Sequence, residues 1–159
     1  MTIKFQLDSS YKQKILINRK DASEDIRSEE CGTNASIIAK YERIRNDMIS
    51  FQRNFLKKPG LIADGRDMGT VVFSDSKIKI FLTADVDVRA KRRYKELKEK
   101  GINVSLAAVL SDMKIRDKQD KERKHGPLTM GHDSILVDST NKSIDVVISE
   151  ILKYYEKIY

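Results

Sequence analysis

Short alternating runs open the chain and predict a β-hairpin. Residues 3–7 and 14–18 alternate apolar and polar positions, and the polar stretch Asp8–Gln13 joins them. The next stretch, residues 19–35, is polar and acidic, which indicates a loop with room for a short helical turn.

One apolar stripe then predicts the clearest helix, over residues 36–57. Ser36 is placed as its N-cap, and Pro59-Gly60 ends it. The stripe recurs at spacings of three and four residues and consists of Ile37, Tyr41, Ile44, Met48, Phe51 and Phe55.

The hydrophobic period changes after this helix. Short apolar runs predict buried strands at residues 61–63, 78–82 and 135–137. Strands that alternate with helices indicate an α/β fold with a parallel sheet. The helices are expected at residues 86–99, from Ser105 onward with Leu106, Val109, Leu110 and Met113 facing inward, and at residues 144–158.

Length and charge narrow the class of protein only slightly. A chain of 159 residues with 40% hydrophobic residues is long enough for one domain with a core. Its net charge of +7 suits polyanions such as nucleotides, nucleic acid or an anionic membrane, without choosing among them. No apolar run reaches membrane-spanning length, and the lone Cys31 forms no intramolecular disulfide, so we expect a cytoplasmic location.

The turn Asp64–Gly69, just after the strand expected at residues 61–63, carries the first candidate chemistry. Polar residues past the carboxyl end of a strand line the ligand crevice of α/β proteins. There Asp64 can help hold Mg²⁺, and Asp67 can accept a hydrogen bond from the exocyclic amine of cytosine. An ordinary Asp/Gly-rich surface turn explains the same spacing equally well. Gly60 and Gly65 match the glycines of a Walker A motif, but Arg66-Asp67 replaces its Lys-Ser/Thr, so no P-loop is expected in these residues.

Arg116 and Arg123 are seven residues apart, with Asp120 between them, which predicts one shared helix face. Two arginines on one face can clamp a phosphate group that carries charge in a transition state. The alternative is a solvated helix supported by pairs such as Asp117–Lys121.

Taken together, the order and wording of these motifs resemble the bacterial cytidylate kinase family. The resemblance rests on GLIADGRDMGTVVF followed by KIFLTA, on TNAS and ERIR, on RDKQDKER, and on LVDST. It runs from about Ile15 to the C-terminus and implies a nucleoside monophosphate kinase-like (P-loop kinase-type) fold. The implied reaction transfers the γ-phosphate of ATP, with Mg²⁺, to CMP or dCMP.

The resemblance also implies roles for individual residues. Ser36, Arg45 and Asp67 match residues that recognise cytosine, while Arg66 and Arg123 match residues on the CMP phosphate.

Arg116 and Asp120 match lid residues near the phosphate and the sugar, and Arg92 and Arg116 are assigned to ATP. Arg66, Arg116, Arg123 and Asp64 form the expected catalytic set, with Asp64 as the metal ligand.

By the same resemblance, residues 1–35 belong to a CMP-binding insert, 36–113 to the α/β core, 114–132 to a mobile lid and 133–159 to the last strand and helix. Family members begin with a central strand, a P-loop, a helix and a second strand. We therefore expect an N-terminally truncated kinase with doubtful activity by itself, a poorly protected sheet edge, and a separate N-terminal fragment as one partner option. A full-length enzyme of this type is expected to be a monomer.

Two other functions stay open from the sequence. One is a kinase-derived protein that binds CMP or a partner without transferring phosphate. The other is a basic nucleic-acid-binding module, which the expected placement of Tyr41, Phe51, Phe55 and Phe81 on core faces argues against, because bases stack on exposed aromatic rings.

Overall fold

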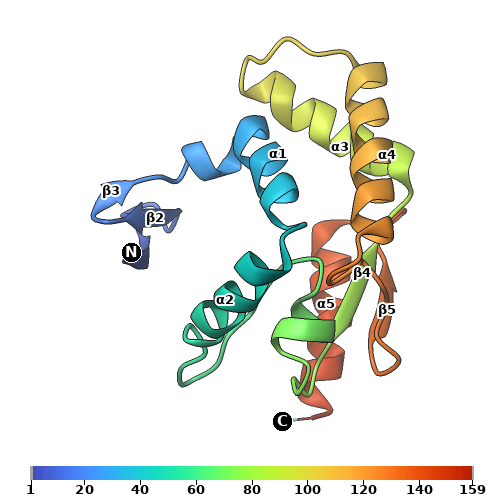
Figure 1. Ribbon diagram of the computed structural model, residues 1–159. Coiled ribbons are helices and arrows are strands. Elements are labelled where there is room, and N and C mark those ends of the chain that lie inside the picture. Colours follow the sequence, from blue (N-terminus) through green and yellow to red (C-terminus); the bar gives the residue numbers. More distant parts are fainter. Residues whose placement is uncertain (1, 159) are drawn as a thin grey trace. The chain divides into compact units, whose positions relative to one another are not determined.

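The computed structural model describes residues 2–158, and the chain forms two compact units, Met1–Asn46 and Asp47–Tyr159 (Figure 1). The first unit contains β1 (Ile3–Leu7), β2 (Gln13–Ile17), β3 (Lys20–Asp21), the 3₁₀ helix η1 (Asp25–Arg27) and α1 (Glu29–Ile38). The boundary between the units falls within α2 (Glu42–Arg53). The second unit continues with the π-helix η2 (Met68–Val72), β4 (Ile80–Thr83), α3 (Val86–Glu99), α4 (Leu106–Glu122), β5 (Ile135–Asp138) and α5 (Ile144–Glu156).

The predicted hairpin is confirmed in the first unit. β1 and β2 pair antiparallel with Phe5 opposite Ile15, and β3 extends the sheet beyond β2. The Asp8 carboxylate fixes the turn by accepting hydrogen bonds of 2.9 Å from the N–H groups of Ser10 and Lys12. The backbone N–H groups of Lys12 and Ser10 lower the pKa of Asp8, because both bonds favour its charged form.

The predicted start of the long helix is wrong. α1 begins within the stretch that was expected to be loop, and its N-cap is Ser28, whose Oγ accepts from the N–H of Cys31 at 3.1 Å. Ser36 lies inside α1 and its hydroxyl donates to the carbonyl of Gly32 at 3.0 Å. Sequence pattern did not reveal α1, because its apolar and polar residues do not separate into two faces.

The predicted continuity of that helix is also wrong. α1 ends at Ile38, where the N–H of Lys40 turns back to the carbonyl of Ile37 at 3.2 Å, a tightened last turn that separates α1 from α2. The break divides the apolar stripe, and Tyr41 is exposed rather than on a core face. Farther along, Phe51 and Phe55 pack edge to face with ring centroids 5.3 Å apart.

The core of the second unit lies between α3 and α4, which Figure 1 shows against each other. Ala90 and Leu97 of α3 are buried against Val109 of α4. Ser105 caps α4 as predicted, because its Oγ accepts from the N–H of Ala108.

Parallel pairing of β4 with β5 confirms the expected α/β architecture, with Leu82 opposite Val137. The strand predicted at residues 61–63 does not form, and Ile62 is fully exposed. A strand needs a hydrogen-bonded neighbour, and within residues 2–158 the parallel sheet consists of β4 and β5 alone. α5 begins after its N-cap Ser143 as expected.

Candidate functional site

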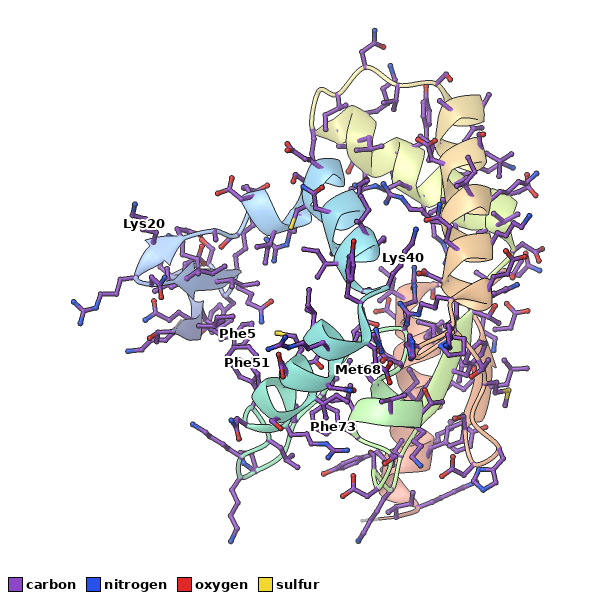
Figure 2. All side chains as sticks on the ribbon, in the orientation of Figure 1. Phe5, Lys20, Lys40, Phe51, Met68 and Phe73 are labelled. Atoms are coloured by element: carbon purple, nitrogen blue, oxygen red, sulfur yellow. The ribbon has the colours of Figure 1, made fainter. Side chains whose placement is uncertain are left out.

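The turn after residues 61–63 leads into η2 and fixes Asp67. The carbonyl of Asp67 accepts hydrogen bonds from the N–H groups of Val71 and Val72 at 2.9 and 3.2 Å, which opens a wide π-type turn. Asp67 is buried, whereas Asp64 and Arg66 are exposed. Figure 2 labels Met68 and Phe73 at the two ends of this turn.

Gly65 lies just before this turn, in contact with the side chain of Met68. A Cβ on Gly65 would come within 2.9 Å of Cγ of Met68, because that side chain lies against the backbone of Gly65. Gly65 therefore leaves room for the side chain of Met68 against the backbone of the turn.

Arg53, at the end of α2, binds two backbone carbonyls of η2. Its Nε donates to the carbonyl of Val72 at 2.6 Å, and its Nη2 donates to the carbonyl of Val71 at 3.3 Å. The helix pattern does not single out this residue, because an exposed arginine that binds a distant carbonyl has the same local sequence as a solvated one.

Arg66, Asp120 and Arg123 come together in the second unit. Nε of Arg66 lies 2.7 Å from Oδ2 of Asp120, and Nη1 of Arg123 lies 3.8 Å from Oδ1 of the same carboxylate. Residues 54 positions apart in the chain thus form one cluster, which we call the arginine cluster. Of its side chains, Arg66 is 54% exposed, against 14% for Asp120 and 10% for Arg123.

The N–H of Arg123 still donates to the carbonyl of Gln119 at 3.1 Å, as on the helix face that it is predicted to share with Arg116. α4 ends at Glu122, and Arg123 is its C-cap with extended backbone angles of φ −65° and ψ 140°. Its Nε donates to the carbonyl of Gly126 at 2.5 Å, and this short loop brings the guanidinium back toward Asp120. Arg116 is partly buried within α4, one turn before Asp120.

Asp117 of α4, which the sequence suggested as a partner of Lys121, is bound by Arg89 of α3. Nη1 and Nη2 of Arg89 donate to the two oxygens of Asp117 at 3.1 and 2.5 Å, and its Nε donates to the carbonyl of Ala84 at 2.9 Å. Arg89 therefore ties the helix that carries Arg116 and Asp120 to the end of β4.

Lys79 joins the loop before β5 to the residues before β4. The Nζ of this buried lysine donates to the carbonyl of Ser74 and to Oδ2 of Asp133, each at 2.5 Å. The hydrogen bond from Lys79 lowers the pKa of Asp133. The side chain of Lys79 also lies along Gly69, where a Cβ would come 3.4 Å from it.

Arg92, assigned to ATP from the sequence, donates to Oγ and to the carbonyl of Ser139 at 3.2 and 2.6 Å. This contact ties α3 to the end of β5, where Ser139 in turn donates to the carbonyl of Thr83. The assignment of Arg92 to ATP stays a prediction.

Ser36 and Arg45 belong to the first unit, Met1–Asn46. The hydroxyl of Ser36 is used within α1, and Arg45 is a partly buried residue of α2. Their part in cytosine recognition stays a prediction.

A magnesium site made of protein ligands alone is not found among residues 2–158, where no three His, Cys, Asp or Glu side chains gather. Mg²⁺ bound through one carboxylate together with nucleotide phosphates needs no such gathering, and the exposed Asp64 fits that chemistry. In the same residues, no helix has the length and apolar character needed to cross a bilayer.

Parallel strands occur in α/β proteins that bind ligands past the strand ends, and arginines are over-represented where phosphate groups are bound. The family model of cytidylate kinase matches residues 1–157, so the match begins earlier than the sequence motifs suggested. The chain belongs to the cytidylate kinase family, which is a family of nucleotide kinases.

Curated relatives agree with this assignment. The chain is 45% identical over 157 residues to cytidylate kinase of Aeromonas salmonicida, covering 99% of this chain and 68% of the relative. It is 46% identical over 141 residues to the enzyme of Nitrosomonas europaea, covering 89% and 63%. It is 44% identical over 150 residues to that of Pseudomonas aeruginosa, covering 94% and 66%. The chain thus spans about two thirds of the length of these relatives.

Proposed function

We propose that this chain carries the CMP-binding and lid residues of a kinase that transfers the γ-phosphate of ATP to CMP or dCMP. The arginine cluster is the observation that carries the proposal. It joins an exposed guanidinium, Arg66, to two lid residues, Asp120 and Arg123, beside the buried Asp67.

The proposed reaction needs positioning and charge stabilisation more than proton transfer. The attacking group is a phosphate oxygen of CMP, which is already anionic, so no catalytic base is required. Arg66 and Arg123 would neutralise the CMP phosphate, and Arg116 would act on the transferred phosphoryl group. Mg²⁺, bound with ATP, supplies further charge neutralisation, and Asp64 would help hold it. In the cytosine site, Asp67 would accept from the N4 amine.

We also propose the division of the chain into a CMP-binding insert (1–35), a core (36–113), a lid (114–132) and a final strand and helix (133–159). Two ion pairs support this division: Arg89 binds Asp117 near the start of the lid, and Lys79 binds Asp133 directly after it.

A kinase of the P-loop type holds the ATP phosphates with a Walker A motif, and the 159 residues contain no such motif. We propose that the ATP phosphates are held by a segment outside these residues, and that the 159 residues alone have little kinase activity. Apolar side chains exposed on the parallel sheet support a further segment there, since parallel strands are normally covered on both faces. These side chains are Leu82 and Leu136.

A coupled assay of ADP release tests the proposal, with MgATP and CMP as substrates and UMP as the control. We expect no turnover from the 159 residues, and CMP-dependent turnover after addition of the third of the Aeromonas salmonicida relative that has no counterpart here. CMP-dependent turnover without that addition would contradict the need for an outside P-loop. Restored turnover that prefers UMP would contradict CMP as the acceptor.

The alternative of a CMP-binding protein without kinase activity is favoured by the missing Walker A motif. Calorimetric binding of CMP, with no ATP binding and no turnover even after the addition, would select this alternative.

A further inference from the structure

The carboxylate of Asp120 lies where an anionic ligand of Arg66 and Arg123 would bind. It takes a charge-assisted hydrogen bond of 2.7 Å from Nε of Arg66 and lies 3.8 Å from Nη1 of Arg123. A guanidinium group recognises a carboxylate and a phosphate through the same planar geometry. Asp120 therefore supplies the negative charge and acceptor oxygens that a bound phosphate would otherwise supply to these two arginines.

The surrounding loop holds Asp120 in this position. Its backbone carbonyl accepts from the N–H of Leu128 at 2.7 Å, and Arg123 is fixed by its bond to the carbonyl of Gly126. Asp120 and Arg123 are largely buried, so this ion pair is screened by water much less than a surface pair.

We infer that Asp120 is an internal counter-anion that withholds Arg66 and Arg123 from simple anions and releases them only to a ligand that carries both a phosphate group and hydroxyl donors. The identity of that ligand as a nucleoside monophosphate rests on the proposed function. The contacts of Asp120 do not depend on it.

Competition between a tethered and a free anion explains the selectivity. Asp120 is already positioned and loses no translational freedom, whereas free phosphate must lose it on binding. Free phosphate would also displace Asp120 into a largely buried position without partners, which is unfavourable for a charged group. A nucleotide avoids this cost, because its sugar hydroxyls can donate to the displaced carboxylate.

Calorimetric titration of inorganic phosphate and of CMP into the chain and its variants tests the inference. Asp120→Asn keeps the shape of the side chain and removes its charge. We expect it to raise the affinity for inorganic phosphate about tenfold and to lower the affinity for CMP. The double variant Arg66→Gln/Asp120→Asn should lose the gain in phosphate affinity.

Asp112→Asn is the matched control, because Asp112 is an exposed residue of the same helix and lies outside the cluster. It removes the same charge and should leave phosphate affinity within about twofold of the unchanged chain, since it alters only longer-range electrostatics. An equal gain in phosphate affinity in both variants would show that the effect comes from net charge alone, and would overturn the inference. Unchanged phosphate affinity in Asp120→Asn would also overturn it.

A measurement on the unchanged chain covers the case in which Asp120→Asn fails to fold. The NMR signal of the Arg66 Nε–H group, assigned with Arg66→Lys, should shift with CMP and stay in place with equimolar phosphate. A shift of equal size with phosphate would overturn the inference. A gain in phosphate affinity in Asp120→Asn, with no CMP binding by any form, would contradict the proposed function and leave the role of Asp120 supported.

Discussion

Arg89 and Asp117 join α3 to α4 through two hydrogen bonds, of 3.1 and 2.5 Å, between a guanidinium group and a carboxylate. The same arginine reaches the carbonyl of Ala84, just past β4. This one side chain of α3 therefore binds both the end of β4 and the helix that carries Arg116 and Asp120.

Arg89→Ala is therefore expected to lower the free energy of unfolding by about 1–3 kcal/mol, because it leaves a partly buried carboxylate without its partner. Urea titration followed by circular dichroism measures the loss. Lys95→Ala is the control, since Lys95 and Glu99 form an exposed pair 3.9 Å apart that contributes about 0–1 kcal/mol. Equal losses in the two variants would show that the Arg89 pair is only a surface contact.

Arg53→Gln is expected to loosen η2, because Val71 and Val72 lose the guanidinium that their carbonyls accept from. Faster hydrogen exchange of the N–H groups of Val71 and Val72 should report this directly. If Asp67 binds cytosine, CMP affinity should fall about 3- to 10-fold in the same variant.

Arg43→Gln serves as the control for Arg53, since Arg43 is an exposed residue of the same helix. Unchanged exchange at Val71 and Val72 in Arg53→Gln would refute the role of Arg53. Faster exchange with unchanged CMP affinity would refute only the link from η2 to cytosine binding.

Strong local signals made much of the fold predictable. The hairpin, β4, β5, α3 and the start of α4 follow from alternation, helical period and capping serines, which depend on near neighbours. The strand predicted at residues 61–63 failed because a strand forms only with a paired neighbour, which local hydrophobicity does not reveal. The prediction of one continuous helix over α1 and α2 failed for another reason. The apolar stripe continues across the tightened turn that separates them, so hydrophobic spacing does not reveal the break.

The candidate site was also predictable only in part. Arg66, Asp120 and Arg123 were predicted from motif order, but their meeting through the loop after α4 was not, because it depends on where that helix ends. Arg53, Lys79 and Arg89 were missed, because a basic residue that binds a distant carbonyl or carboxylate has the same local sequence as a solvated one.

Ile62→Ser is expected to leave the stability of the 159 residues within about 0.5 kcal/mol, because the side chain is fully exposed and makes little contact to lose. It should also reduce self-association in sedimentation experiments, since exposed apolar side chains favour association. The buried Val137→Ala is the contrast and should cost about 1–3 kcal/mol. A cost for Ile62→Ser that approaches that of Val137→Ala would show that residues 61–63 are buried in solution.

The ion pair between Lys79 and Asp133 predicts a specific dependence of stability on pH. The hydrogen bond from Lys79 lowers the pKa of Asp133 below its ordinary value of 3.8. A carboxyl group with a depressed folded-state pKa contributes stability that is present above the unfolded value and disappears as the pH falls through the folded value. The contribution should therefore be complete at neutral pH and decline only in acid, below about pH 4.

Asp133→Asn should accordingly lower the free energy of unfolding at pH 7, where it leaves the buried ammonium group of Lys79 with a neutral partner. The gap between the variant and the unchanged chain should narrow below pH 4, once Asp133 itself is protonated. Urea titrations at pH 7, 5 and 3 measure the gap, and Asp75→Asn, at an exposed carboxylate before β4, is the control. A gap that stays constant down to pH 3 would mean that the charge of Asp133 does not stabilise the fold, and that the Asn side chain differs only in its packing.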